Sequence, residues 1–262
     1  MAAAYYGVCR LAVVSVRNEP RHSAQQLTQL LFGDHYEVSE LSADKLWARI
    51  RVYTDGSEGW IDFRQHHNIS EEYFQQINQT EYKITTEVAS TVLYKKLPMT
   101  IVMGSIVPIS SSELFKIEEQ FAFNGESKNL GQRRDAEFVR QIARKYLSAP
   151  YQWGGKSPFG IDHTGLIQMA FRIAGYPLPR QLKELLTAGK PVASPSEAQA
   201  GDVAFFTMKG STPTHCGILD GEERVIHAHG MVRLDAFNEE GILVQDTKIF
   251  THFLHSIRRI VG

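Results

Sequence analysis

The chain has 262 residues, of which 43% are hydrophobic and 22% are charged, and its formal net charge is −1. This length is sufficient for two or three compact domains. The near-neutral charge gives no electrostatic reason to bind nucleic acid or an anionic membrane surface, so we exclude both as partners. Two cysteines, Cys9 and Cys216, are too few for a disulfide framework and lack the spacing of a zinc site.

The sequence also bears on localisation. No apolar stretch approaches the roughly 18 residues of a membrane span, and the first residues lack the basic and apolar segments of a signal peptide. We therefore expect a soluble, cytoplasmic protein as the sequence is written. Removal of a signal peptide would instead place it in the periplasm or outside the cell.

The first quarter of the chain is predicted to form short strands separated by turns. They cover residues 10–16, 27–31, 35–41, 46–53 and 59–62. Apolar and polar residues alternate over 47–53, and the turn residues Asp55 and Gly56 follow. This pattern is typical of a small antiparallel barrel.

The middle of the chain is predicted to begin with a polar linking helix over 70–79. Strands over 88–94, 99–109 and 114–117 then indicate a second, more diverged barrel. Residues 124–131 are rich in Gly, Asn and Ser and are predicted to be a linker.

The remainder is predicted to be an α+β domain, because helices are followed by a run of strands. Apolar residues at helical spacing predict a helix over 135–147, which must end before Pro150. Further helices are predicted over 166–174 and 182–187. The predicted strands are 203–206, 215–219, 224–228, 232–234 and 253–260.

A Gly-rich loop, residues 149–162, leads directly into the predicted helix at 166. A side chain at position 163 would lie near unpaired backbone N–H groups and the positive end of the helix dipole. That environment lowers the pKa of a cysteine and is common around reactive thiolates. Position 163 is a histidine, however.

This loop resembles that of the NlpC-type cell-wall peptidases, which are papain-like enzymes. The residues that match their nucleophile loop are Pro150, Tyr151, Trp153, Gly154, Gly155, Ser157, Gly160, Asp162, Gly165 and Leu166. Three later segments, 201–206, 214–218 and 225–228, resemble the strands that follow in the same family. The resemblance implies a papain-like α+β domain over 132–262.

The N-terminal part resembles bacterial Src-homology-3-like (SH3-like) domains. The matching motifs contain Val16, Arg17 and Pro20, then Leu31 to Asp34, and then Glu58 to Ile61. Together with the strand pattern, this resemblance implies one SH3-like domain over 1–68 and a second over 80–124. Both are all-β barrels.

The family resemblance also implies roles for particular residues. His215 is at the position of the general base, and His227 is at the position that orients the base. His163 is at the nucleophile position, where the family has cysteine. Imidazole forms no thioester and attacks an unactivated amide poorly, so we predict loss of ordinary cysteine-peptidase chemistry. Cys216 follows His215 directly in a strand and therefore points to the opposite face, where we expect it to pack.

A different chemistry remains as an alternative. If His163, His215 and His227 converge, with Asp162 and His229 nearby, three imidazoles have the ligand type and number for zinc with an open water position. The papain-like arrangement serves a Cys–His contact, however, rather than a tetrahedral metal site. We therefore predict no cofactor and no metal, and keep zinc on these three histidines as the alternative.

Substrate-binding residues are predicted separately. In relatives that cut murein stem peptides, an aspartate before the cysteine, a loop tyrosine and an acidic barrel residue recognise the free amine of L-Ala. The matching residues are Asp162, Tyr151 and Glu58. Trp153 is expected to line the same pocket, and Thr164 lies at its edge or caps the helix.

Three hypotheses for function follow. The first is a murein stem-peptide-binding protein, built like a γ-D-glutamyl-L-diamino acid endopeptidase but inactive at its nucleophile. The second is a hydrolase of murein peptides with altered, zinc-dependent chemistry. The third is a structural module whose SH3-like domains bind a protein partner and whose active site is vestigial.

Overall fold

A computed structural model describes residues 5–79, 82–107, 121–208, 212–244 and 247–262. The chain divides into two compact units. The first unit is Met1–Gln132 with Trp153–Pro158, and the second is Arg133–Gln152 with Phe159–Gly262. In the described part of the chain, no helix is long and apolar enough to cross a membrane.

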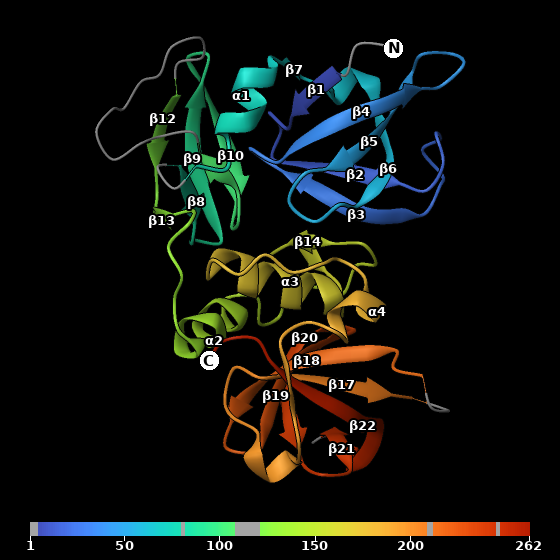
Figure 1. Cartoon of the computed structure of the whole chain (residues 1–262), viewed down its shortest axis with the longest axis vertical. Coiled ribbons are helices and arrows are strands. Elements are labelled where there is room, and N and C mark those ends of the chain that lie inside the picture. Colours follow the sequence, from blue (N-terminus) through green and yellow to red (C-terminus); the bar gives the residue numbers. More distant parts are fainter. Residues whose placement is uncertain (1–4, 80–81, 108–120, 209–211, 245–246) are drawn as a thin grey trace. The chain divides into compact units, whose positions relative to one another are not determined.

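A seven-stranded antiparallel sheet opens the first unit, in the order β3-β2-β6-β5-β4-β1-β7 (Figure 1). Its strands are β1 (Tyr5–Val8), β2 (Val13–Arg17), β3 (Gln26–Leu31), β4 (His35–Leu41), β5 (Trp47–Val52), β6 (Glu58–Asp62) and β7 (Asn68–Ile69). Inward side chains at alternate positions of β5, including Ala48, Ile50 and Val52, form its core. The short helix η1 (Phe63–Gln65) precedes β7.

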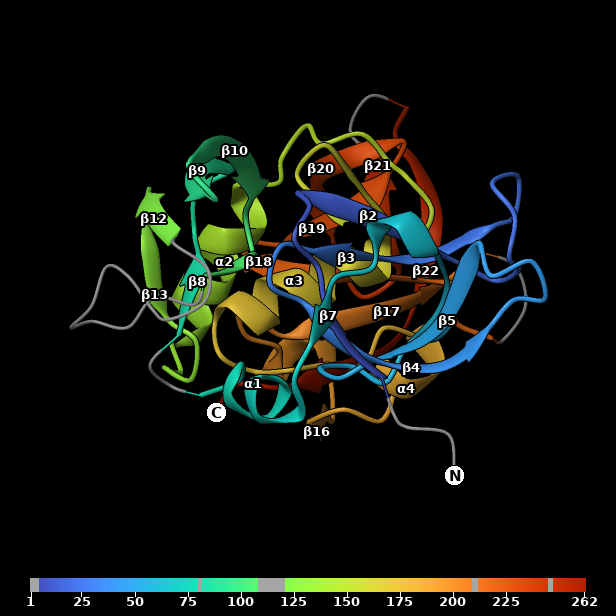
Figure 2. The same cartoon turned by 90° about the horizontal axis from the view of Figure 1, so that it is seen from above.

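Two smaller sheets follow a short helix. Helix α1 (Glu71–Gln76) follows β7 along the chain (Figure 2). It is capped by Ser70 and buries Phe74. The sheets have the orders β10-β9-β12 and β11-β8-β13. Their strands are β8 (Lys83–Thr85), β9 (Ala89–Tyr94), β10 (Leu97–Val102), β11 (Ile106–Val107), β12 (Phe121–Asn124) and β13 (Ser127–Asn129).

Two predictions for this stretch are wrong. The predicted strand 99–109 is interrupted at Gly104, whose φ of +86° belongs to a turn. The predicted linker 124–131 contains β13, which pairs with β8, so sheet pairing overrides its loop-like composition. The predicted strand 114–117 and the last two residues of 99–109 lie outside the described residues.

The segment Trp153–Pro158 belongs to the first unit although it follows the first helix of the second. Its strand β14 (Lys156–Ser157) is held on β3 by a hydrogen bond from the Lys156 amide to Gln29 Oε1 at 2.8 Å. Lys156 Nζ is buried 3.8 Å from a carboxylate oxygen of both Asp34 and Asp55. The backbone at Gly154 has φ +74° and passes so near Gln26 that a Cβ would lie 2.7 Å from its carbonyl oxygen.

The second unit has helices α2 (Ala136–Arg144) and α3 (His163–Ile173), which contact each other and β18. Its sheet has the order β16-β22-β17-β18-β19-β20-β21, and β21 also pairs with β22, which closes the ring. The strands of this sheet are β16 (Lys190–Val192), β17 (Val203–Thr207), β18 (His215–Gly221), β19 (Arg224–His229), β20 (Met231–Phe237), β21 (Gly241–Val244) and β22 (Ile249–Arg259). Strand β15 (Gly160–Ile161) lies outside this sheet. Short helices are α4 (Leu182–Leu185) and η2 (Pro195–Glu197).

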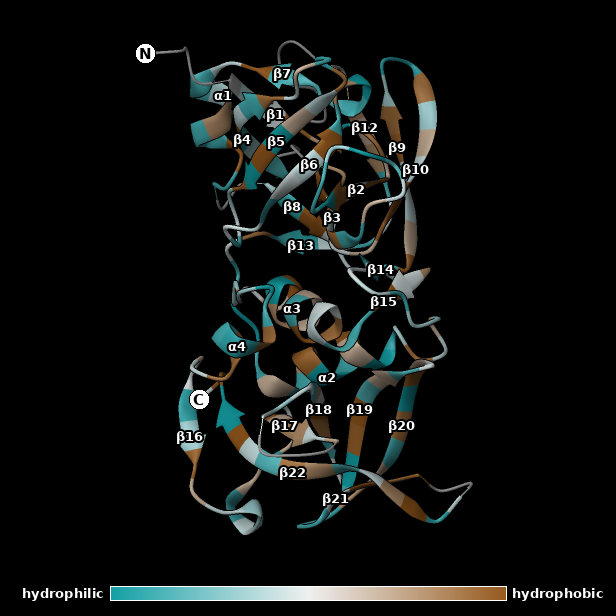
Figure 3. Cartoon of the chain, turned by 90° about the vertical axis from the view of Figure 1, so that its right-hand side faces the viewer, coloured by the Kyte–Doolittle hydropathy of each residue, from teal (hydrophilic) through white to brown (hydrophobic). Residues whose placement is uncertain are grey.

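The prediction of an α+β class is confirmed. Strand β17 and helix α3 are buried along their whole length, so they form the centre of this unit. Both hydrophobic and hydrophilic residues occur along β22, in agreement with its mixture of buried and exposed positions (Figure 3). Strand β21 was missed because its four residues carry too short a pattern to be recognised.

Candidate functional site

Helix α3 begins three residues earlier than predicted, at His163, because Asp162 is its N-cap. Asp162 Oδ1 accepts a hydrogen bond from the Gly165 amide at 2.7 Å. Thr164 Oγ1 donates to the same carboxylate oxygen at 3.1 Å, so Thr164 supports the cap and is not itself the cap. His163 is therefore fixed at the first residue of the helix.

Arg180, to which the sequence analysis gave no role, holds this cap in place. Its Nη2 lies 2.7 Å from Asp162 Oδ2, and its Nη1 donates to Thr164 Oγ1. All three side chains are buried. Burial raises the pKa of Asp162, but the charge and hydrogen bonds of Arg180, with the Gly165 amide, bring it below its usual value. Asp162 is thus ionised and already paired.

Opposite the helix start, the strands carry a line of polar side chains. His215 Nε2 lies 2.9 Å from His227 Nδ1, and His227 Nε2 lies 3.0 Å from Asp235 Oδ2. The strand register explains the contacts, because Gly217 pairs with His227 and Val225 pairs with Asp235. The bonded residues are therefore diagonal neighbours on one face. We call Asp235, His227 and His215 the carboxylate–histidine chain.

Electrostatics determine the protonation of this chain. Burial raises the pKa of Asp235, but hydrogen bonds from His227 and Arg233 lower it below its usual value. Burial lowers the pKa values of His215 and His227. An ionised Asp235 accepts a hydrogen bond from the Nε2–H of His227, which leaves His227 Nδ1 as an acceptor. His215 must then donate through Nε2, so its Nδ1 carries a free lone pair.

The structure places His163 close to the carboxylate–histidine chain. The ring centroids of His163 and His215 are 4.9 Å apart. The ring of Tyr151 is stacked on the same histidine, with 6.5 Å between the centroids of Tyr151 and His163. His163, His215 and His227 are therefore close together, with Asp162 and Thr164 beside His163 in sequence. Cys216 lies under the helix start, where its Sγ contacts the His163 carbonyl at 3.6 Å. Burial raises the pKa of the Cys216 thiol, which stays protonated.

Two further histidines border the cluster. His252 is buried, with its ring centroid 4.3 Å from that of His215 and 5.1 Å from that of His229. His252 lies outside the sequence motifs, and its approach to His215 depends on the pairing of β17 with both β18 and β22. His255, three residues further along β22, is exposed and forms a hydrogen bond with Ser256.

Within the described residues, no group of three His, Cys, Asp or Glu side chains has the arrangement of a metal site. The hydrogen bonds explain why the proposed zinc ligands do not fit. Both nitrogens of His227 and the Nε2 of His215 are engaged in the carboxylate–histidine chain. Zinc would have to break these bonds before using His163, His215 and His227 together.

Two predicted binding residues belong to the other unit. Trp153 is 55% exposed, and its carbonyl accepts a hydrogen bond from Gln26 at 3.1 Å. Glu58 is exposed and pairs with Arg49 at 3.2 Å.

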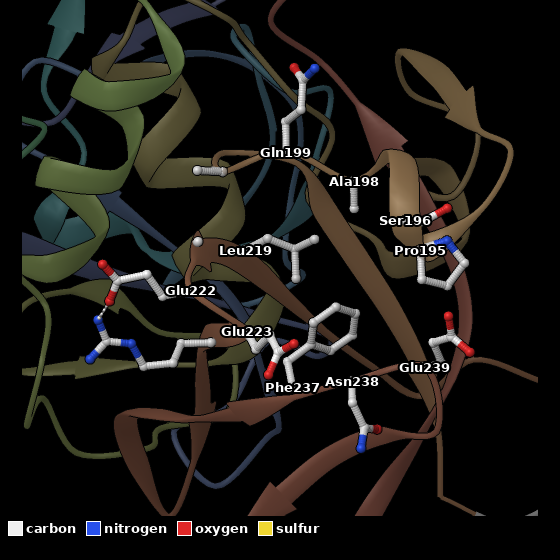
Figure 4. A pocket seen from close by; sticks show the side chains of 13 residues that line it. Pro195, Ser196, Ala198, Gln199, Leu219, Glu222, Glu223, Phe237, Asn238 and Glu239 are labelled. Carbon is white, nitrogen blue, oxygen red and sulfur yellow. Dashed lines mark hydrogen bonds and ion pairs between the residues drawn. The ribbon is translucent and has the colours of Figure 1, made fainter.

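A separate cavity of about 290 Å³ lies elsewhere in the second unit (Figure 4). Leu219 and Phe237 provide apolar surface, and Glu222, Glu223 and Glu239 provide carboxylates. Glu222 pairs with Arg224 at 2.7 Å. None of the site residues predicted from sequence lines this cavity.

Comparisons with known proteins agree with the fold and the motifs. The NlpC/P60 family profile matches residues 148–253, and the profile of the bacterial dipeptidyl-peptidase Sh3 domain matches residues 16–64. A solved NlpC/P60 family protein from Bacillus cereus superposes with a TM-score of 0.83 at 16% identity, covering 98% of this chain and 100% of that one. An NlpC/P60 endopeptidase from Photobacterium damselae gives 0.71 at 16% identity, covering 96% and 70%.

Curated relatives are similar over different lengths. The bifunctional muramidase/DL-endopeptidase CwlT of Bacillus subtilis is 40% identical over 115 residues, which cover 43% of this chain and only 32% of CwlT. The γ-D-glutamyl-L-lysine dipeptidyl-peptidase of Bacillus subtilis is 26% identical, covering 77% of this chain and 71% of the relative. Dipeptidyl-peptidase 6 of Lysinibacillus sphaericus is also 26% identical, covering 80% and 82%.

The resemblance predicted from the loop and strand motifs is confirmed by these matches. The chain carries an NlpC/P60 domain over residues 148–253, preceded by a bacterial dipeptidyl-peptidase SH3 domain over residues 16–64.

Proposed function

We propose that the protein binds murein stem peptides with a free N-terminal L-Ala and leaves their peptide bonds intact. One observation carries this proposal: His163 is the side chain that the start of α3 presents to His215, at 4.9 Å between ring centroids. A cysteine peptidase needs a thiolate there to form an acyl-enzyme. Imidazole attack on an amide returns to reactants, because the amine leaves less readily than imidazole.

The substrate class is supported by the names of relatives that share most of their length with this chain. Two of them are a γ-D-glutamyl-L-lysine dipeptidyl-peptidase and a dipeptidyl-peptidase. Both names describe removal of a dipeptide, which requires recognition of a free N-terminus. A buried carboxylate is the natural partner of that ammonium group.

Asp162 is the carboxylate that we assign to this role, together with Tyr151. Arg180 already neutralises Asp162, so an incoming ammonium must share the carboxylate oxygens with the guanidinium. A carboxylate has about four lone-pair sites, which allows such sharing. The amine is therefore expected to contribute to affinity without being the sole anchor.

The test is calorimetric titration with the tripeptide L-Ala-γ-D-Glu-diamino acid, with mass spectrometry of the same samples. We expect binding without cleavage. Acetylation of the tripeptide N-terminus should weaken binding by about tenfold or more, since it removes one charge-assisted hydrogen-bond group. Tyr151→Phe is the matched protein variant, because it removes only a hydroxyl.

Each of the other possible results would contradict part of the proposed function. Cleavage of the tripeptide would contradict the pseudoenzyme proposal and lead to metal analysis and the zinc-hydrolase alternative. Equal affinity for the acetylated and free peptides would contradict amine recognition. Absence of both binding and cleavage would favour the third hypothesis, a module that binds a protein partner through its SH3-like domains.

A further inference from the structure

The carboxylate–histidine chain contains the hydrogen bonds needed to orient a general base. Asp235 fixes the tautomer of His227, and His227 fixes that of His215. Arg233 Nη2 also bonds Asp235 at 2.9 Å and balances its charge.

His163 is not part of the hydrogen-bonded line that engages His215 and His227. Its ring nitrogens have no hydrogen-bond partner among the residues that the structure describes, although the residue is only 9% exposed. Burial lowers the pKa of His163, so the imidazole is neutral near neutral pH and retains a lone pair. A neutral imidazole is a nucleophile.

The distance to His215 permits proton transfer. The rings of His215 and His227 have centroids 5.1 Å apart and share a hydrogen bond of 2.9 Å. The centroids of His163 and His215 are 4.9 Å apart, a separation close to that of the hydrogen-bonded pair. Contacts of this kind often shorten only when substrate binds.

We propose that His163, assisted by the carboxylate–histidine chain, is a nucleophile toward activated acyl compounds, namely esters and thioesters with good leaving groups. This activity goes beyond the proposed peptide binding and is compatible with it. The same site would turn over activated esters or thioesters and leave amides uncleaved.

The reaction balances without a cofactor. A His163 ring nitrogen forms a bond to the acyl carbon, and the carbon–oxygen or carbon–sulfur bond breaks with its electron pair on the leaving group. The second His163 nitrogen gives its proton to His215 Nδ1, from which the leaving group takes it. Water then attacks the acyl-imidazole, the carbon–nitrogen bond breaks, and a carboxylic acid and free His163 result.

The experiment measures hydrolysis of p-nitrophenyl acetate by the full chain, with His163→Ala and His163→Gln as test variants. We expect the wild-type protein to exceed both variants by about tenfold or more. His255→Ala is the matched control, because His255 is an exposed histidine outside the cluster, and its rate should equal that of the wild type. Circular dichroism of every variant verifies folding.

Two further readouts separate nucleophilic from structural roles. After an acid quench, peptide mass spectrometry should find one acetyl group on His163, removable by hydroxylamine. Asp235→Asn should reduce the rate and shift its pH profile. Equal rates for the wild type and folded His163→Gln, or an acetyl group found only on other residues, would overturn the proposal. Because the ester is no murein peptide, this failure would leave the binding test unaffected.

Discussion

The strand side and the helix side of the histidine cluster are organised differently. On the strand side, hydrogen bonds join His215, His227 and Asp235 in one line. On the helix side, Asp162 and Arg180 form a buried ion pair, and His163 stands next to it without a hydrogen bond to any described residue. One side is therefore a network, and the other is a braced helix end with one independent side chain.

This difference explains how position 163 can carry a histidine without disturbing the site. Replacing a member of a buried network leaves its partners unsatisfied, which costs about 1–3 kcal/mol for each group. A side chain outside the network leaves no such group behind. The identity of residue 163 is thus free to change while the base and the helix cap remain.

The largest effect is expected from removing the ion pair between Arg180 and Asp162 at the start of α3. Arg180→Met should lower the free energy of unfolding by about 3–5 kcal/mol, because it leaves the Asp162 carboxylate buried without its counter-ion. Urea denaturation followed by circular dichroism measures this change. The same substitution in an Asp162→Asn background should cost much less, since no unpaired carboxylate remains.

That double-variant cycle decides what Arg180 does. Equal losses in the two backgrounds would show that Arg180 acts by packing alone, and the helix side would then not be an electrostatic brace.

A smaller effect is expected from acid. Burial lowers the pKa of His252 from 6.5 to about 4, and burial also lowers the pKa values of His163, His215 and His227. Between pH 6.5 and about 4, the unfolded chain binds more protons than the folded chain. The contribution of these groups to stability is therefore present above pH 6.5 and is lost as the pH falls toward 4.

The measurement compares unfolding of wild type and His252→Gln at pH about 7.5 and about 5. The variant should lose less stability between the two pH values, because it lacks one imidazole whose pKa is lowered by burial. If the variant and the wild type lost the same stability between the two pH values, His252 would not be one of the groups responsible. The pH dependence would then be assigned to the other three histidines alone.

The smallest effect is expected at the exposed ion pair of the other unit. Glu58→Gln should change the free energy of unfolding by less than about 1 kcal/mol, because its pair with Arg49 is open to solvent. Tripeptide affinity of the same variant tests its predicted role in amine recognition. Weaker binding at unchanged stability would support that role, and unchanged binding would reduce Glu58 to a surface residue.

Much of the fold could be predicted from local patterns. The alternating stretch at β5 and the buried runs at β17 and β18 appear in the sequence as strands, and the apolar spacing of α2 appears as a helix. Errors occurred where neighbouring segments decide the structure. Strand β13 forms because β8 pairs with it, and the start of α3 depends on the conformation of Asp162.

The site was only partly predictable for the same reason. Motif spacing identified His163, His215 and His227. Arg180, Asp235 and His252 carry no recognisable local signal, because each acts on a residue that is distant in sequence or on another strand. Strand register brings Asp235 to His227, and the pairing of β17 with both β18 and β22 brings His252 to His215.

The sequence by itself determined the family resemblance, the α+β class and the chemical identity of residue 163, because these depend on residue type and short-range spacing. Only the tertiary structure decided which groups are charged, which nitrogens are free and which side chain braces the helix. Those properties depend on burial and on hydrogen bonds between distant segments.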